Sequence, residues 1–152
     1  MKDKGKTFDY QLMSATIDDL DRIKKYKFDS VHLSDEQMTE EETNKINYYI
    51  ETNLPSQIEN YKNIIFKGEI IGNYLVTDIG DGYLIDEIYI EEQYRGKGIG
   101  LSIINSIIEC SDCNIYLWVY KTNKAFSLYK RLGFKIKEET ETRYYMEYKG
   151  SI

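Results

Sequence analysis

The chain carries the stretch Gln93-Tyr94-Arg95-Gly96-Lys97-Gly98-Ile99-Gly100 between an apolar run, Tyr83 to Ile90, and an amphipathic run, Leu101 to Glu109. This order predicts a strand, a glycine turn and the start of a helix. The first N–H groups of a helix have no helical partners and lie at the positive end of its dipole, and glycine lets a ligand come close to them. Because Arg95 and Lys97 add positive charge here, the stretch predicts a binding site for phosphate or pyrophosphate.

The spacing of these glycines separates the stretch from two better-known phosphate motifs. A Walker loop needs Gly-x4-Gly-Lys-Ser/Thr and a dinucleotide fingerprint needs Gly-x-Gly-x-x-Gly, whereas the glycines at 96, 98 and 100 alternate. The spacing Arg95-x-x-Gly98-x-Gly100 resembles the pyrophosphate loop of the GNAT superfamily of acetyl-CoA-dependent N-acetyltransferases. A later segment strengthens the resemblance, since Leu117-Trp118-Val119-Tyr120 precedes a run from Asn123 to Phe134 that contains Tyr129 and ends in Gly-Phe.

Hydrophobic periodicity predicts an α/β fold. Strands are expected at residues 8–13, 63–67, 69–79, 83–90, 114–120, 134–138 and 143–149, and helices at 17–26, 39–52, 101–109 and 124–132. The resemblance implies a mixed, mainly antiparallel central sheet flanked by helices, in which two central strands splay apart. We predict a single N-acetyltransferase domain over residues 1–152.

Composition narrows the class of protein. The chain has 152 residues, 41% of them hydrophobic, and a net charge of −6, which favours a folded domain and disfavours nucleic acid as a partner. No apolar run approaches the ~20 residues of a membrane span, and none follows the N-terminus as a signal peptide would require. We therefore predict a cytoplasmic protein with no membrane partner. Cys110, Cys113 and the single His32 fall short of the four ligands of a zinc site, so no metal is expected.

The resemblance implies how acetyl-CoA binds. Backbone groups in a gap between splayed strands need partners, and a pantetheine arm carries two amides that supply them. The loop at 95–100 would hold the pyrophosphate, and Asn123 would cap a helix and contact the arm. Residues 121–135 contain five basic residues and no acid, as a ligand rich in phosphate requires, although such a run is also typical of a solvated helix face. The predicted cofactor-binding residues are Ile88, Tyr89, Ile90, Arg95, Gly96, Lys97, Gly98, Ile99, Gly100, Asn123 and Lys130.

Acetyl transfer to an amine requires a neutral amine, a stabilised oxyanion and a proton for the departing thiolate. The resemblance assigns the general base to Asp86 and the proton donor to Tyr129. Strand alternation puts 86, 88 and 90 on one face and 87 on the other with 83, 85 and 89. A bulge or twist would reverse this, so Glu87 stays the alternative base. A structural carboxylate at Asp86 and a packed aromatic at Tyr129 are the non-catalytic interpretations.

The acceptor is predicted from charge. Residues 28–60 hold eight carboxylates against one lysine, a net charge of −7, and by resemblance this region lines the acceptor side. An acidic wall attracts cationic acceptors, so we predict a small polyamine or an aminoglycoside-like amine. The alternatives are a protein or peptide amine and a non-catalytic acyl-CoA-binding module, and Glu40-Glu41-Glu42 is also what the first turn of a solvated helix favours. Whether the chain forms a homodimer is left open.

Overall fold

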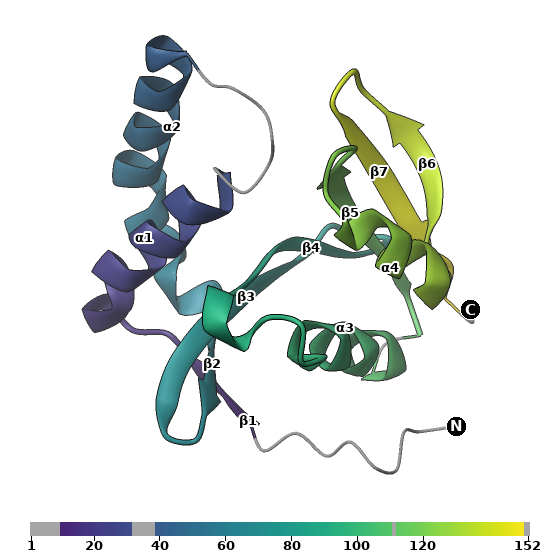
Figure 1. Ribbon diagram of the computed structural model, residues 1–152, viewed down its shortest axis with the longest axis horizontal. Coiled ribbons are helices and arrows are strands. Elements are labelled where there is room, and N and C mark those ends of the chain that lie inside the picture. Colours follow the sequence, from purple (N-terminus) through teal and green to yellow (C-terminus); the bar gives the residue numbers. More distant parts are fainter. Residues whose placement is uncertain (1–9, 32–38, 111, 151–152) are drawn as a thin grey trace.

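The computed structural model describes residues 10–31, 39–110 and 112–150, and its seven strands form one sheet in the order β1-β2-β3-β4-β5-β7-β6 (Figure 1). Neighbouring strands run antiparallel except β4 and β5, which are parallel. His32 lies outside the described residues. The strands are β1 (Tyr10–Ser14), β2 (Tyr61–Phe66), β3 (Glu69–Asp78), β4 (Gly82–Ile90), β5 (Asn114–Tyr120), β6 (Lys135–Glu139) and β7 (Arg143–Tyr148).

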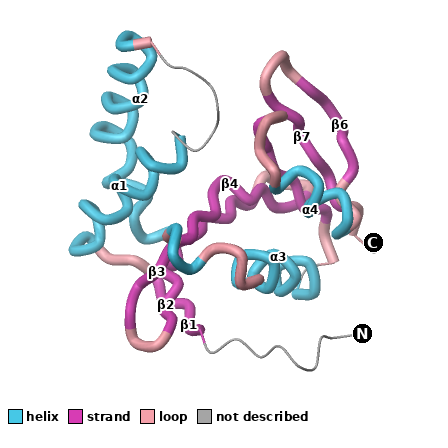
Figure 2. Tube along the Cα trace, viewed as in Figure 1, coloured by secondary structure: helices cyan, strands magenta, loops and turns pink. Residues whose placement is uncertain are grey.

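Helices lie on both sides of this sheet (Figures 1 and 2). The α-helices are α1 (Leu20–Val31), α2 (Glu40–Asn53), α3 (Ile99–Cys110) and α4 (Ala125–Leu132), and the short 3-10 helices are η1 (Ile17–Asp19), η2 (Leu54–Asn60) and η3 (Glu92–Tyr94). The mixed, mainly antiparallel α/β fold predicted from the sequence is confirmed. None of the helices in the described part of the chain has the length and apolar character needed to cross a membrane.

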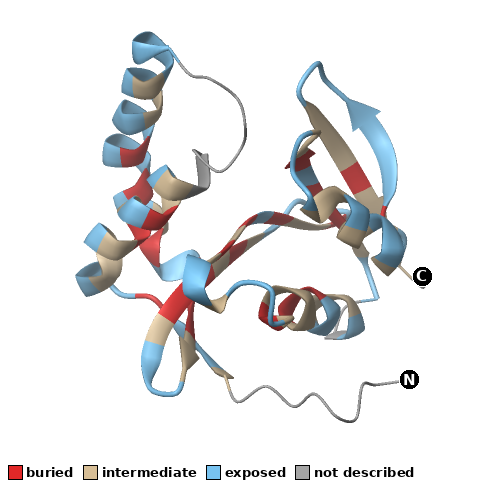
Figure 3. Ribbon diagram, viewed as in Figure 1, coloured by how far each residue is buried: buried red, intermediate tan, exposed pale blue. Residues whose placement is uncertain are grey.

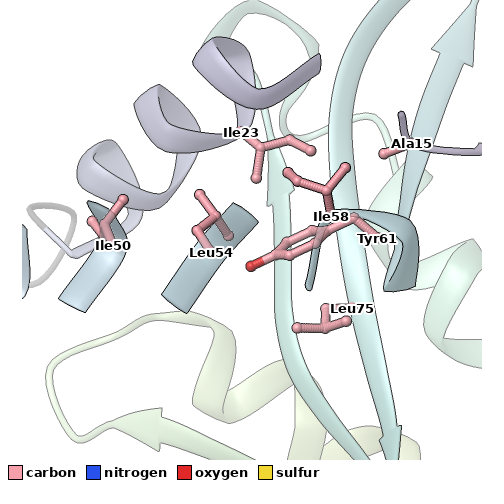
Figure 4. Close-up of a cluster of buried hydrophobic side chains, with 7 residues drawn as sticks. All are labelled: Ala15, Ile23, Ile50, Leu54, Ile58, Tyr61 and Leu75. Carbon is pink, nitrogen blue, oxygen red and sulfur yellow. The ribbon is translucent and has the colours of Figure 1, made fainter. Parts of the chain in front are cut away.

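The two faces of the sheet have separate cores. On one face, Ile23 of α1, Ile50 of α2 and residues of η2 pack on Tyr61 and Leu75 (Figure 4). On the other face, α3 inserts Ile99 and Ile103 against β2 and β3 and Ile104 against β4 and β5. The outer turns of α2 and the whole of β6 remain exposed (Figure 3). The face that carries α1 and α2 is called the α1 face below, and the other the α3 face.

A β-bulge interrupts the pairing of β3 with β4. Leu75 pairs with Glu87 and Val76 pairs with Ile85, so Asp86 is the extra residue on β4. An extra residue bends a strand and shifts the alternation of its side chains. The parallel pairing of β4 with β5 also stops here, because its last pair is Ile85 with Leu117. The second half of β4 therefore leaves β5, as the predicted splay requires.

Candidate active site

A cavity of about 560 Å³ lies where β4 leaves β5. This volume is in the range of small-molecule and cofactor sites. The end of β4, the glycine loop, α3 and α4 all contribute to its walls. The lining residues are Ile88, Tyr89, Ile90, Tyr94, Arg95, Gly96, Gly98, Ile99, Gly100, Leu101, Ile104, Ala125, Leu128, Tyr129 and Arg131.

The glycine loop has the backbone that the sequence predicts. Gly96 and Gly98 have φ values of 78° and 89°, in the left-handed region that favours glycine. The first backbone bond of α3 runs from the Ser102 N–H to the Gly98 carbonyl at 3.0 Å, so the N–H groups of residues 99–101 have no acceptor within the helix. A Cβ added at Gly96 would meet nothing within 4 Å, so the loop is open at this position. Helix N–H groups without acceptors next to an open loop suit an anion such as a pyrophosphate.

Two arginines supply positive charge to the cavity. Arg95 lines it, and its Nε donates to the Ile90 carbonyl at 2.6 Å. Arg131 of α4 also lines it, whereas the predicted Lys97 and Lys130 are not among the lining residues. The Lys130 ammonium lies 5.5 Å from the centroid of the Phe126 ring instead. The helical period of α4 could have predicted Arg131 in place of Lys130. Ala125, Leu128 and Arg131 are spaced at i, i+3 and i+6, so they lie on the same side of the helix.

Tyr129 lies in the wall of the cavity, on α4. It is half-buried beside the aliphatic cluster of β4, β5 and α3, and its hydroxyl has no hydrogen bond to any residue that the structure describes. Burial raises the pKa of Tyr129 above its usual value of 10.0, so the hydroxyl is protonated at neutral pH and is able to donate. Asn123 lies outside the lining, and its Oδ1 accepts a hydrogen bond from the Ala125 N–H at 2.8 Å at the start of α4.

The bulge corrects the strand alternation assumed from the sequence. Glu87 faces α1, but Ile85 belongs to the core on the α3 face, so the predicted grouping of 87 with 83 and 85 is wrong. The extra residue at position 86 is the physical reason. Asp86 is exposed and accepts a hydrogen bond from the Thr77 hydroxyl. Thr77 lies two residues beyond Leu75 on β3, and Leu75 belongs to the core on the α1 face. Thr77 therefore shares that face, and its contact places both candidate bases there.

Glu87 is the buried carboxylate of the pair. It is 8% exposed, its Oε2 lies 2.8 Å from the Lys27 ammonium, and the same oxygen accepts a hydrogen bond from the Tyr61 hydroxyl at 3.3 Å. Burial and then the Glu87 charge raise the pKa of Tyr61, which keeps its hydroxyl protonated. The Oε1 of Glu87 has no protein partner among the described residues. Lys27 and Tyr61 come from α1 and β2, far from Glu87 in sequence, and no local motif predicts them.

Part of the acidic charge in residues 28–60 is paired within the protein. Asp29 forms an ion pair with Lys25 at 2.8 Å and Glu51 forms one with Lys24 at 3.0 Å. Glu42 caps α2, because its Oε1 accepts a hydrogen bond from the Thr39 N–H at 2.9 Å. Asp35 and Glu36 lie outside the described residues. Glu40 and Glu41 are exposed in the first turn of α2.

Comparison with solved structures gives the class to which this fold belongs. The structure of the PaiA N-acetyltransferase from Thermoplasma acidophilum in complex with coenzyme A superimposes with a TM-score of 0.76 at 20% identity, over 93% of this chain and 99% of that one. At this identity the likeness concerns the fold, which is that of an N-acetyltransferase.

Sequence comparison identifies the family of the chain. The profile of the acetyltransferase (GNAT) domain matches residues 59–136, just over half of the chain. An uncharacterised N-acetyltransferase of Methanocaldococcus jannaschii is 44% identical over 59 residues, and the spermine/spermidine N(1)-acetyltransferase of Bacillus subtilis is 35% identical over 63. The first stretch covers 36% of this chain and 26% of that protein, and the second covers 38% of this chain and 41% of that protein, so the chain spans less than half the length of either relative. The chain belongs to the GNAT family of acyl-CoA-dependent N-acetyltransferases, as the motifs predicted.

Proposed function

We propose that this chain transfers an acetyl group from acetyl-CoA to a primary amine by direct attack, without a covalent enzyme intermediate. The observation that carries the proposal is the cavity beside the splayed strands, which joins the glycine loop to Tyr129. Loop N–H groups and Arg95 suit the pyrophosphate at one end of the cavity. The acetyl thioester supplies the electrophile. The cytoplasmic location predicted from the sequence stays a prediction.

In this proposal the edge of β4 that is not paired with β5 binds the pantetheine arm. Residues 86–90 have no pairing with β5. Apart from the Ile90 carbonyl, which Arg95 already engages, their backbone groups on that side are available to the two amides of the arm. A backbone N–H near Ile90 polarises the thioester carbonyl and stabilises the oxyanion. The Tyr129 hydroxyl gives its proton to the departing thiolate. Burial raises the pKa of Tyr129 above its usual value, so this hydroxyl carries a proton to give at neutral pH.

The general base comes from the carboxylates at the bulge. Asp86 is our first candidate because it is exposed and only the Thr77 hydroxyl engages it among the hydrogen bonds of the described residues. One oxygen of Glu87 is already bound to Lys27 and Tyr61, so this carboxylate is the alternative base and a candidate for orienting the amine. Either one lies on the α1 face and would receive the amine proton directly or through a water.

A small cationic amine is the acceptor that we propose. The α1 face carries Asp86 and Glu87, and the exposed Glu40 and Glu41 add negative charge on α2. A field of this sign raises the local concentration of a polycation. The partial likeness to a spermine/spermidine acetyltransferase points to the same class of acceptor.

The proposal is tested by measuring CoA release from acetyl-CoA with a panel of amines: spermidine, an aminoglycoside, a neutral-bodied monoamine and a peptide with a free N-terminus. We expect turnover with a cationic acceptor above the rate without amine. If the peptide proves the best acceptor, the enzyme is a protein or peptide acetyltransferase. CoA binding without turnover on any amine would identify a non-catalytic module and refute the proposal.

A further inference from the structure

A row of side chains runs from α1 to the glycine loop. The Tyr26 ring stacks on the Tyr89 ring with centroids 4.6 Å apart and planes inclined by 24°. The Arg95 guanidinium carbon lies 5.2 Å from the centroid of the same Tyr89 ring. Tyr26 and Tyr89 are only 2% and 7% exposed, so both rings are held by packing. Arg95, at the end of the row, lines the cofactor cavity.

Carboxylates fix the hydroxyl ends of both rings. The Tyr26 hydroxyl donates to Glu91 Oε2 at 2.5 Å, and the Tyr89 hydroxyl donates to Asp29 Oδ2 at 3.3 Å. Burial, together with Glu91 for Tyr26 and Asp29 for Tyr89, raises the pKa of both tyrosines above the usual value. Their hydroxyls therefore stay protonated and donating at neutral pH, and each ring has one orientation.

This arrangement constrains a long cationic side chain. The Nε of Arg95 is bound to the Ile90 carbonyl at 2.6 Å and its guanidinium is held over Tyr89. A cation over an aromatic ring is attracted by the ring's quadrupole. A guanidinium oriented in advance loses less conformational entropy when it binds an anion, which increases affinity.

We propose that Tyr26 is a positioning residue, which holds Arg95 through Tyr89 for the pyrophosphate of acetyl-CoA. Tyr26 is not among the residues that line the cavity, so its effect on the cofactor is indirect. The inference rests on the proposed function only in taking the cavity as the CoA site. It also makes α1, which contacts Glu87 through Lys27, part of the support of the cofactor site.

The test is a double-mutant cycle on CoA affinity, measured by calorimetry, with Tyr26→Leu, Arg95→Ala and both together. If Tyr26 acts through Arg95, we expect Tyr26→Leu to weaken CoA binding about fivefold when Arg95 is present and less than about twofold when it is alanine. The cycle is repeated with Tyr26→Met, which retains more of the buried volume. Tyr26→Phe keeps the ring and should remain within about twofold of the wild type.

Three results would overturn the inference: an equal loss from Tyr26→Leu in both backgrounds, no loss in either, or an Arg95→Ala variant with wild-type CoA affinity. The first of these would mean that Tyr26 contributes only to general stability. The measurement does not depend on turnover. A protein that binds CoA with the expected coupling but acetylates no amine would refute the proposed function and leave this inference intact.

Discussion

The two sides of β4 are built from different kinds of contact. On the α3 face, the proposed cofactor cavity is formed by a strand edge, the glycine loop, a helix start and part of α4, and residues 88–101 supply most of its lining. On the α1 face, Glu87 meets Lys27 and Tyr61, which lie 60 and 26 residues away in the sequence. Most of the first site comes from one continuous segment, to which α4 adds one wall, whereas the second site joins side chains from separate elements. The proposed cofactor side is thus determined largely by one local segment, and the proposed acceptor side depends on how distant elements pack.

The largest effect on kcat should come from Tyr129, which is proposed to act where the acetyl group passes from the cofactor to the amine. Tyr129→Phe removes the proposed proton donor, so we expect kcat to fall about 10²–10⁴-fold with little change in KM for acetyl-CoA. Burial raises the pKa of Tyr129, so loss of its proton should limit kcat only above about pH 10. Tyr144→Phe is the matched control, since Tyr144 packs against Phe126 of the same helix outside the cavity lining. An unchanged kcat with chemistry rate-limiting would reduce Tyr129 to a packing residue.

Substitutions of the two carboxylates at the bulge, Asp86 and Glu87, test which of them is the general base. We expect Asp86→Asn to lower kcat about 10²-fold and to remove the acidic limb of the pH profile of kcat/KM, because the proposed base is lost. Glu87→Gln should affect stability more than the pH profile, because it leaves the Lys27 ammonium without its partner. Thermal melting and pH–rate profiles of both variants separate the two roles. If Glu87→Gln alone removes the acidic limb, Glu87 is the base.

The glycine loop tests the cofactor side. Gly98→Trp places a large side chain on a left-handed residue in the cavity wall, so CoA affinity should fall about 100-fold. Gly80→Trp is the matched control, because Gly80 has a φ of 100° in a turn with nothing within 4 Å of an added Cβ. Calorimetry with CoA compares the two. Wild-type affinity in a folded Gly98→Trp protein would contradict the assignment of the loop.

The smallest effect concerns the charge of α2. Replacing Glu40 and Glu41 with Gln, while Glu42 is left to cap the helix, should lower kcat/KM for spermidine about two- to threefold and leave a monoamine unchanged. Salt above 0.1 M should reduce the same preference, since exposed charges are then screened beyond about 10 Å. Gln at Glu138 and Glu141, on the β6–β7 hairpin, is the control. A preference that neither salt nor these substitutions alter would show that the acidic turn only stabilises α2.

The contrast between the two sides also explains what the sequence could predict. The strand, glycine turn and helix start at 83–109 follow from local periodicity, and the structure has them at Gly82–Ile90 and Ile99–Cys110. The bulge at Asp86 was not predictable, because it depends on the register of β4 against β3. For the same reason Ile85 was wrongly grouped with Glu87 on one face of the sheet. Neither the sequence around Lys27 nor that around Glu87 predicts their ion pair.

Charge patterns were the least informative signal. Lys130 and Arg131 are adjacent, and only the helical phase set by Ala125 and Leu128 distinguishes the one that lines the cavity. The acidic total of residues 28–60 likewise conceals the carboxylates that pair or cap within the protein, such as Asp29 and Glu42. A count of charges gives the sign of a field, whereas packing decides which groups contribute to it.

The most direct test of the whole account is a crystal structure with a bisubstrate analogue, in which CoA is joined through an acetyl link to spermidine. We predict that the pyrophosphate contacts the N–H groups of residues 96–101, that the pantetheine arm lies along β4 at 86–90, and that the amine chain emerges beside Asp86 and Glu87 on the α1 face. An analogue bound entirely on the α3 face, or with its amine chain directed away from both carboxylates, would contradict the separation of cofactor and acceptor on which the account rests.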